Sequence, residues 1–238
     1  MKTEGRNAVI ELLKTQKNID KILLEKGAQG SLGLIFAEAR RKNIRVQFVD
    51  KQVLDKESET RRHQGVIAFT TDYEYYDLDE IIAAKKSEKG GFVVLCDGIE
   101  DVHNLGSIIR VAECAGADGV VIPKSGSASV TESVIRISAG AAEHMKVAKV
   151  GNLNQAIEKL QKSGYWVFGL EAGGEDIYKE KFEGNVALVV GGEDSGVKRL
   201  TKEKCDKILS IPLQGKVNSL NASVALGIAV YEVVRNRL

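Results

Sequence analysis

From Gly91 onward, the sequence alternates short, continuously apolar runs with segments of helical periodicity, and this alternation restricts the fold more than any other feature. The apolar runs fall at residues 92–96, 119–122, 146–150, 165–170, 186–190 and 207–211. The helical segments between and after them cover 105–115, 130–140, 153–163 and 222–234. Strands without polar alternation must be covered on both faces, which is typical of parallel sheets. The pattern therefore predicts an α/β domain built on a parallel sheet.

The front of the chain follows a different pattern, a mixture of short helices and strands. Helical spacing is found at 5–17 and from 31 to 39, and strand-like segments lie at 22–24, 44–49 and 65–69. The next residues combine three tyrosines, a run of acids, a short helical segment and a Lys/Ser/Gly tail. We therefore expect three parts: a small α/β domain at 1–72, a linker with a short helix at 73–90, and the larger domain at 91–238.

The charges are distributed unevenly between these parts. Residues 1–72 contain fourteen basic and ten acidic residues, whereas the rest of the chain contains twenty basic and twenty-three acidic ones. An excess of base in the front domain is compatible with binding to a polyanion, and also with ordinary solubility. Within this domain, Arg61, Arg62 and His63 lie in a polar loop. This loop either contacts RNA phosphates or is simply solvated.

The cysteines and the N-terminus bear on the compartment. The three cysteines are isolated, with neither a Cys-x-x-Cys pair nor a histidine at metal-binding spacing. We therefore expect free thiols, a reducing compartment and no metal site. The first residues lack the apolar core of a signal peptide, and no apolar run is long enough to span a bilayer. These features predict a cytoplasmic protein that is not bound to a membrane.

Three polar loops of the larger domain, at 97–110, 191–197 and 211–223, follow apolar strands. Parallel sheets bind their ligands just beyond the carboxyl ends of the strands, so we expect these loops to converge on one site. In the third loop, four small polar residues stand at the start of the almost uncharged final helix: Asn218, Ser219, Asn221 and Ser223. Helix capping employs one or two of them, which leaves the others available for a polar or anionic ligand.

Several familiar enzyme classes are excluded by missing motifs. No Gly-x-Gly-x-x-Gly follows a strand, and no Gly-x-x-x-x-Gly-Lys-Ser/Thr is present, so the two common phosphate-binding loops are absent. The sequence also lacks a nucleophilic serine elbow. The three histidines, His63, His103 and His144, are far apart and form no metal-binding cluster.

Three segments carry a resemblance to a known family. They read Asn104-x-Gly-x-x-x-Arg110, Gly191-x-Glu-x-x-Gly196, and Ile211-Pro-Leu continuing to Asn218-Ser-Leu-Asn-Ala-Ser223. In order and spacing they resemble the three motifs of the SpoU/TrmH (SPOUT) group of S-adenosylmethionine-dependent RNA ribose 2'-O-methyltransferases. The resemblance covers nearly the whole chain. One departure is Val102, where many relatives have proline.

The front domain carries its own part of the resemblance. Its opening Gly5-Arg6-Asn7 and the segment His63-Gln-Gly-Val resemble the substrate-binding domain of the RlmB branch, the 23S rRNA guanosine methyltransferases. That domain is related to small ribosomal RNA-binding proteins. The resemblance implies that Arg6, Arg61, Arg62 and His63 contact RNA.

The resemblance also implies the fold and cofactor of the larger domain. It implies a trefoil-knotted α/β domain, in which the end of the chain passes through a loop. The residue pattern alone would predict an ordinary open sheet. S-adenosylmethionine would bind at the knot, in a pocket lined by Gly191, Gly192, Ile211, Leu213 and Leu220. Glycine suits this role because backbone can approach a ligand closely where no Cβ intervenes.

The family's catalytic roles fall on Arg110, Asn104, Glu193, Ser219 and Asn221. The implied reaction is an in-line attack of a ribose 2'-hydroxyl on a sulfonium methyl group. Because a guanidinium keeps its proton beyond about pH 12, we expect Arg110 to stabilise the developing alkoxide and hold a phosphate. Asn104 and Glu193 would orient Arg110 or the substrate, and Ser219 and Asn221 would fix the loop and the nucleotide. Without the motif, Arg110 would be interpreted as an exposed helix residue.

The resulting hypothesis is a homodimeric enzyme that methylates a guanosine ribose in 23S rRNA. The dimer is implied by the resemblance, and the final helix at 222–234 supports it because it is too apolar for a helix with a single covered face. Methylation of tRNA is an alternative, against which the extra front domain argues. A non-catalytic RNA-binding assembly factor is a second alternative, which broken motifs would favour.

Overall fold

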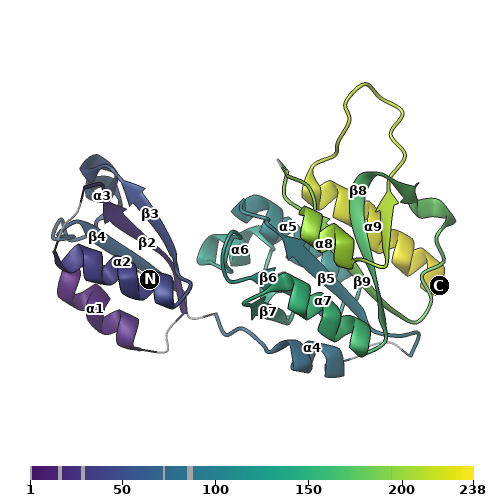
Figure 1. The fold of residues 1–238 in the computed structure, drawn as a ribbon, viewed down its shortest axis with the longest axis horizontal. Helices are drawn as coiled ribbons and strands as arrows, with labels where there is room; N and C mark the ends of the chain where they lie inside the picture. Colours follow the sequence, from purple (N-terminus) through teal and green to yellow (C-terminus); the bar gives the residue numbers. More distant parts are fainter. Residues whose placement is uncertain (1, 16–17, 28–29, 72, 85–87, 194) are drawn as a thin grey trace. The chain divides into compact units, whose positions relative to one another are not determined.

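The computed structural model describes residues 2–15, 18–27, 30–71, 73–84, 88–193 and 195–238. The chain forms two compact units, Met1–Glu74 and Tyr75–Leu238, each of which is described by itself (Figure 1). None of the helices in these described ranges has the length and apolar character needed to cross a bilayer.

The described residues of the first unit form a mixed four-stranded sheet in the order β1-β4-β2-β3. Strand β4 pairs antiparallel with both β1 and β2, whereas β2 and β3 are parallel. The strands are β1 (Lys2–Glu4), β2 (Asn18–Glu25), β3 (Arg45–Val49) and β4 (Val66–Thr71). The helices are α1 (Arg6–Lys14), α2 (Ser31–Arg41) and α3 (Lys51–Glu57).

Both faces of this small sheet are covered. Ile22 and Leu24 of β2 pack in one core cluster with residues of α1 and α2. Leu23, between them in the strand, packs instead with Ile67 of β4 and Leu54 of α3. Successive side chains of a strand point to opposite faces, so this alternation places α1 and α2 on one face and α3 on the other. The small α/β domain predicted from the sequence is confirmed.

The second unit is built on a six-stranded sheet in the order β10-β8-β9-β5-β6-β7, as far as the chain is described. All of its strand pairs are parallel, which confirms the prediction from the apolar runs. The strands are β5 (Phe92–Asp97), β6 (Gly119–Pro123), β7 (Val147–Val150), β8 (Tyr165–Asp176), β9 (Asn185–Gly191) and β10 (Lys207–Ser210).

Helices cover both faces of this sheet, which explains why its central strands are continuously apolar. Helices α4 and α7 pack in one core cluster with alternate residues of β5 and β9. Helix α5 packs against α6 and α9 on the other face (Figure 1). The helices are α4 (Leu78–Ala84), α5 (Val102–Cys114), α6 (Glu132–Ile137), α7 (Leu153–Lys162), α8 (Arg199–Lys204) and α9 (Ala222–Arg237), with short 3-10 helices η1 (Ala141–Glu143) and η2 (Ile177–Lys179).

Some elements differ from the sequence prediction for identifiable reasons. Helix α5 begins at Val102 rather than at residue 105, because the Asp101 side chain caps it by accepting a hydrogen bond from the His103 amide at 2.8 Å. The helix expected at 130–140 ends at Ile137, and Ala139 and Gly140 both have positive φ before η1. Helix α4, expected in a linker, buries Ile81 in the core of the second unit. The trefoil knot stays a prediction.

Candidate active site

A cleft of about 740 Å³ opens at the carboxyl ends of strands β8, β9 and β10. Sites for small organic ligands typically occupy about 300 to 1,000 Å³, so this carboxyl-edge cleft is of suitable size. Seven of the ten residues predicted to be catalytic or cofactor-binding contribute to its lining: Gly191, Gly192, Glu193, Ile211, Leu213, Ser219 and Leu220. The second and third polar loops therefore meet at this edge and form walls of the cleft.

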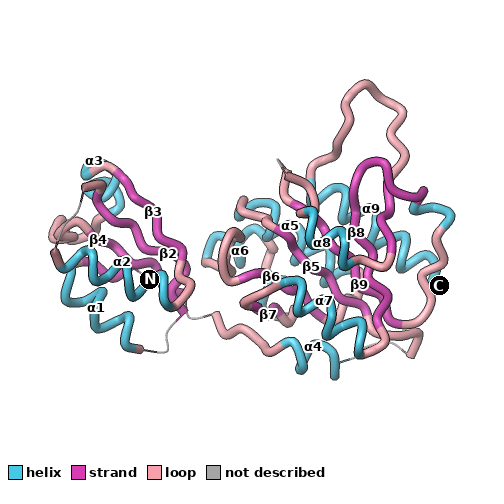
Figure 2. The backbone as a smooth tube through the Cα atoms, viewed as in Figure 1, coloured by secondary structure: helices cyan, strands magenta, loops and turns pink. Residues whose placement is uncertain are grey.

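The loop between β10 and α9 forms one wall of the cleft. It is the long loop drawn in pink that stands out from the second unit in Figure 2. Leu213 and Leu220 remain 39% and 38% exposed although both are large and apolar. Apolar side chains left exposed in a cleft offer surface that an apolar part of a ligand can cover.

The glycines of the second loop are required by the protein's own backbone. A Cβ atom added at Gly191 would lie 1.9 Å from the carbonyl carbon of Gly196, and one at Gly192 would lie 2.5 Å from the Gly98 oxygen. The Gly192 amide donates to the Asp97 carbonyl at 3.1 Å, and the Gly196 amide donates to Gly192 at 2.8 Å. The missing side chains thus allow the loop to fold tightly against the end of β5.

Two carboxylates not selected from the sequence hold this second loop in place. Asp97, which is buried at the end of β5, accepts a hydrogen bond from the Lys198 amide at 2.9 Å. Glu171, at the cleft wall, accepts one from the Val197 amide at 2.9 Å. A sequence signal existed for both residues, since each is an acid that follows an apolar strand segment.

A hydrogen-bond network of Asn104, Glu193 and Asn221 joins the three loops. The Asn104 side chain donates to Glu193 Oε1 at 3.0 Å. The Asn221 side chain donates to Asn104 Oδ1 at 2.9 Å and to Glu193 Oε1 at 2.6 Å. Asn221 also caps α9, because its Oδ1 accepts from the amides of Ser223 and Val224. Three of the five predicted catalytic residues therefore meet beside the cleft.

Arg110 does not belong to this network. It is exposed on α5, and its guanidinium makes no hydrogen bond or ion pair with the residues that the structure describes. Six residues at about 100° each place Arg110 on a different face of the helix from Asn104, which is buried. Asn104 therefore lies in the network beside the cleft, whereas Arg110 lies on the exposed surface of α5.

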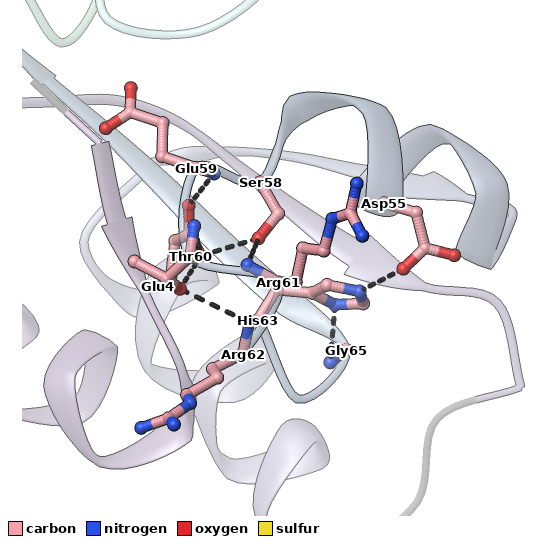
Figure 3. A network of polar contacts seen from close by, with 9 residues as sticks. All are labelled: Glu4, Asp55, Ser58, Glu59, Thr60, Arg61, Arg62, His63 and Gly65. Atoms are coloured by element: carbon pink, nitrogen blue, oxygen red, sulfur yellow. Dashed lines mark hydrogen bonds and ion pairs between the residues drawn. The ribbon is translucent and has the colours of Figure 1, made fainter.

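A second polar network, in the first unit, organises residues 58–64, which we call the 58–64 loop (Figure 3). The Glu4 carboxylate accepts hydrogen bonds from the hydroxyls of Ser58 at 2.7 Å and Thr60 at 2.5 Å. It also accepts one from the Glu59 amide at 2.6 Å. A single carboxylate from β1 thus binds three consecutive residues that lie more than fifty positions away in sequence.

The predicted RNA-binding residues take different positions around this loop. Arg61 and Arg62 are exposed. His63 is only 4% exposed; its Nε2 lies 2.9 Å from Asp55 Oδ1, and its Nδ1 accepts from the Gly65 amide at 3.0 Å. The Arg6 guanidinium donates to the Gln64 carbonyl at 3.0 Å and to the Ser31 hydroxyl at 3.3 Å. Both His63 and Arg6 therefore make hydrogen bonds within the first unit that help to fix the 58–64 loop.

The hydrogen bonds to Glu4 change its acidity. Burial acts to raise the pKa of Glu4, but hydrogen bonds from Thr60 and Ser58 and from the amides of Glu59 and Thr60 outweigh it and lower the pKa to about 2. Because the folded-state pKa lies below the ordinary value of 4.5, the ionised form stabilises the fold above pH 4.5. That contribution is lost as the pH falls toward 2.

We predict that Glu4→Gln lowers the stability of the first unit at neutral pH and that the difference from wild type shrinks in acid. Since solvent weakens such partly exposed bonds, the neutral-pH loss should be on the order of 1 kcal/mol. Urea unfolding at pH 7 and at several values below pH 4.5 measures it. Glu11→Gln, which breaks a surface ion pair with Lys14, is the control and should show a smaller difference. A Glu4 difference that stays constant down to pH 2 would contradict the assignment.

Comparison with known proteins matches both units to one family. The sequence model of the SpoU rRNA Methylase family matches residues 91–231, and a model described as RNA 2'-O ribose methyltransferase substrate binding matches residues 3–76. YacO of Bacillus subtilis, named for the TrmH family of tRNA/rRNA methyltransferases, is 42% identical over 98% of this chain and 94% of its own.

Solved structures share the fold. An rRNA methyltransferase from Sinorhizobium meliloti with bound AdoMet has a TM-score of 0.63 and 23% identity, and the match covers 100% of this chain and 87% of that one. The TrmH/SpoU tRNA modifying enzyme of A. aeolicus has a TM-score of 0.58 and 27% identity, with coverage of 67% and 80%. Together with the motifs that meet at the carboxyl-edge cleft, these matches show that the chain belongs to the SpoU family of RNA methyltransferases.

Proposed function

We propose that this chain transfers the methyl group of S-adenosylmethionine to a ribose 2'-hydroxyl of RNA, most specifically to a guanosine of 23S rRNA. The observation that carries the proposal is the convergence of the three family motifs. The second and third motifs line the carboxyl-edge cleft, and the Asn104–Glu193–Asn221 network joins them to the first. A non-catalytic assembly factor would not need this arrangement to be intact.

The residues of the carboxyl-edge cleft fit the cofactor. When bound, S-adenosylmethionine supplies an electrophilic methyl group on a sulfonium centre. The exposed side chains of Leu213 and Leu220, together with Ile211, offer apolar surface for the adenine. Gly191 and Gly192 line the opposite wall, where the absence of side chains lets a ligand approach the backbone closely. These are the five cofactor-binding residues expected from the sequence.

The proposed roles of Glu193, Asn221 and Ser219 follow from their positions, and that of Arg110 follows from its charge and its place in the first family motif. Glu193 and Asn221 fix the two cleft loops against Asn104, so that the cleft keeps one shape while substrate binds. Ser219, in the cleft wall, offers a hydroxyl to the nucleotide. Arg110 remains protonated and stabilises the alkoxide that develops on the ribose oxygen, holding an adjacent phosphate at the same time. It acts through its charge and not as a base.

Two observations favour rRNA over tRNA. The first unit matches a substrate-binding family model, which we take as an additional RNA-binding surface outside the methyltransferase domain. The solved rRNA methyltransferase also covers the whole of this chain, whereas the tRNA modifying enzyme covers two thirds of it. Methylation of tRNA stays the second candidate, because the Bacillus subtilis relative is named for both RNAs.

In this proposal the three parts of the chain have different roles. We assign RNA recognition to residues 1–72, the connection to 73–90 and methyl transfer to 91–238. In the first domain, Arg61 and Arg62 face the RNA, while Arg6 and His63 act indirectly by shaping the loop. The knotted path of the final segment and a cytoplasmic location, where ribosomal RNA is modified, complete the proposal.

We predict that the purified protein incorporates tritiated methyl groups from S-adenosylmethionine into protein-free 23S rRNA and that Arg110→Ala lowers the rate by about 100-fold or more. Cofactor binding by the variant should be unchanged, because Arg110 lies outside the cleft. Lys162→Ala removes a cation at the end of α7 and should have no effect. Incorporation into bulk tRNA but not rRNA would favour the second candidate. Wild-type activity in Arg110→Ala would refute its role.

A homodimer is part of this proposal. On α9, Val224 and Tyr231 are 51% and 50% exposed and lie seven residues apart, so they share one face of the helix. A second chain on this face would cover both side chains. Because α5 packs against α9, such a dimer would place the second chain near α5, the helix that carries Arg110.

We predict that light scattering behind a sizing column gives a mass twice that of the 25.8 kDa chain. The double variant Val224→Glu with Tyr231→Glu should elute as a monomer, because it places charges in the apolar interface. Trp166→Glu alters a side chain that is 55% exposed elsewhere in the same unit and should leave the dimer intact. A wild-type mass equal to that of one chain would refute the proposed homodimer.

A further inference from the structure

The contacts of Glu4 continue beyond the two hydroxyls that bind it. Ser58 Oγ donates to Glu4 and accepts a hydrogen bond from the Arg61 amide at 2.8 Å. Thr60 Oγ1 donates to Glu4 and accepts one from the Arg62 amide at 3.2 Å. Each hydroxyl therefore links the Glu4 carboxylate to the backbone amide of one arginine through two hydrogen bonds, an arrangement we call a relay. Figure 3 shows both relays within a single turn of chain.

The other end of the 58–64 loop is fixed independently. Gln64 binds Arg6 through both its side chain and its carbonyl, at 3.1 and 3.0 Å. His63 is buried between Asp55 and the Gly65 amide. Arg61 and Gln64 have φ values of 57° and 50°, a region that non-glycine residues adopt at some cost and keep only where contacts enforce it.

The 58–64 loop leaves the side chains of Arg61 and Arg62 available to bind a ligand. Within the described part of the chain, the guanidinium groups of Arg61 and Arg62 form no hydrogen bond or ion pair, and both residues are exposed. Two neighbouring acids are engaged elsewhere, since Glu4 is turned into the loop and Glu57 pairs with Lys2 at 3.0 Å, whereas the Glu59 side chain is exposed in the same loop. In Figure 3 the Arg62 side chain points away from the network. A rigid loop with two free guanidiniums is suited to contact the phosphates of a nucleic-acid backbone.

We propose that Glu4 is a positioning residue for RNA binding, holding the 58–64 loop in the one conformation that presents Arg61 and Arg62 to RNA phosphates. The inference rests on the proposed function, because it takes the substrate to be RNA. A preformed loop binds more tightly than a mobile one, since less conformational entropy is lost on binding.

The direction in which RNA affinity changes when Glu4 is removed distinguishes this positioning role from a purely electrostatic one. A carboxylate near an RNA-binding surface repels phosphate, so its removal would strengthen binding if charge alone mattered. A positioning role requires the opposite, because the loop would lose its conformation when Glu4 is removed. Glu11 is the matched control, being an exposed acid of the same unit that pairs with Lys14 on the surface.

The experiment is filter binding of radiolabelled, protein-free 23S rRNA to the full-length chain over a range of salt concentrations. We expect Glu4→Ala to weaken binding by roughly threefold or more and Glu11→Ala to leave it unchanged or slightly stronger. The double variant Arg61→Gln with Arg62→Gln should reduce the slope of log K against log salt by about 1.4 to 1.8, the value for two phosphate contacts. Equal or tighter binding by Glu4→Ala would overturn the proposal.

A double-mutant cycle tests whether Glu4 acts through the arginines. Adding Glu4→Ala to the double arginine variant should cause no further loss, whereas the same loss in both backgrounds would place the effect of Glu4 elsewhere and refute the proposal. Thr60→Val removes one relay and keeps the carboxylate, so it should also weaken binding. Thr60→Val therefore provides the test if Glu4→Ala fails to fold. Circular dichroism and cofactor binding would reveal such a failure.

The two proposals can fail separately. Methyl transfer to RNA together with unaltered RNA affinity in the double arginine variant would leave the proposed function standing and remove this inference. RNA affinity that depends on Glu4 and both arginines, in a protein without methyl transfer activity, would support the inference and refute the proposed function.

Discussion

The hydrogen bonds among Asn104, Glu193 and Asn221 are the interaction on which the site depends. They join segments that are almost ninety residues apart in one case and more than one hundred in another. Each segment follows or precedes a regular element of the parallel sheet, so the network fixes where α5, the end of β9 and the start of α9 stand relative to one another. The shape of the carboxyl-edge cleft follows from that arrangement, and so does its ability to hold a cofactor in one pose.

The fold of the second unit could be predicted because its physical cause is visible in sequence. A buried parallel strand such as β5 or β9 has no polar face, and helices must separate such strands. The packing of α4 could not be predicted in this way. Ile81 looks like part of a short linker helix, and its burial depends on Gly119, where an added Cβ would lie 2.5 Å from it. Such long-range fits leave no periodic signal.

The site was predictable to the extent that it follows strand order. Polar residues after parallel strands meet at one edge, and the five residues predicted to bind the cofactor do line one cleft. Strand order does not place Arg110, which lies six residues after Asn104 and on a different face of α5. In the first unit, a basic loop was visible, but its organising residue was not. Glu4 lies more than fifty residues from its partners, and His63 is buried where an exposed ring was expected.

The central claim is that the carboxyl-edge cleft binds S-adenosylmethionine, and calorimetric titration of that compound into the intact protein tests it most directly. The account predicts saturable binding with one site per chain, weakened by roughly tenfold or more when Leu213 and Leu220 are both changed to alanine. Leu200→Ala, an exposed leucine that does not line the cleft, should bind as wild type does. Absence of binding to the wild-type chain, or equal affinity in the double leucine variant, would contradict the account.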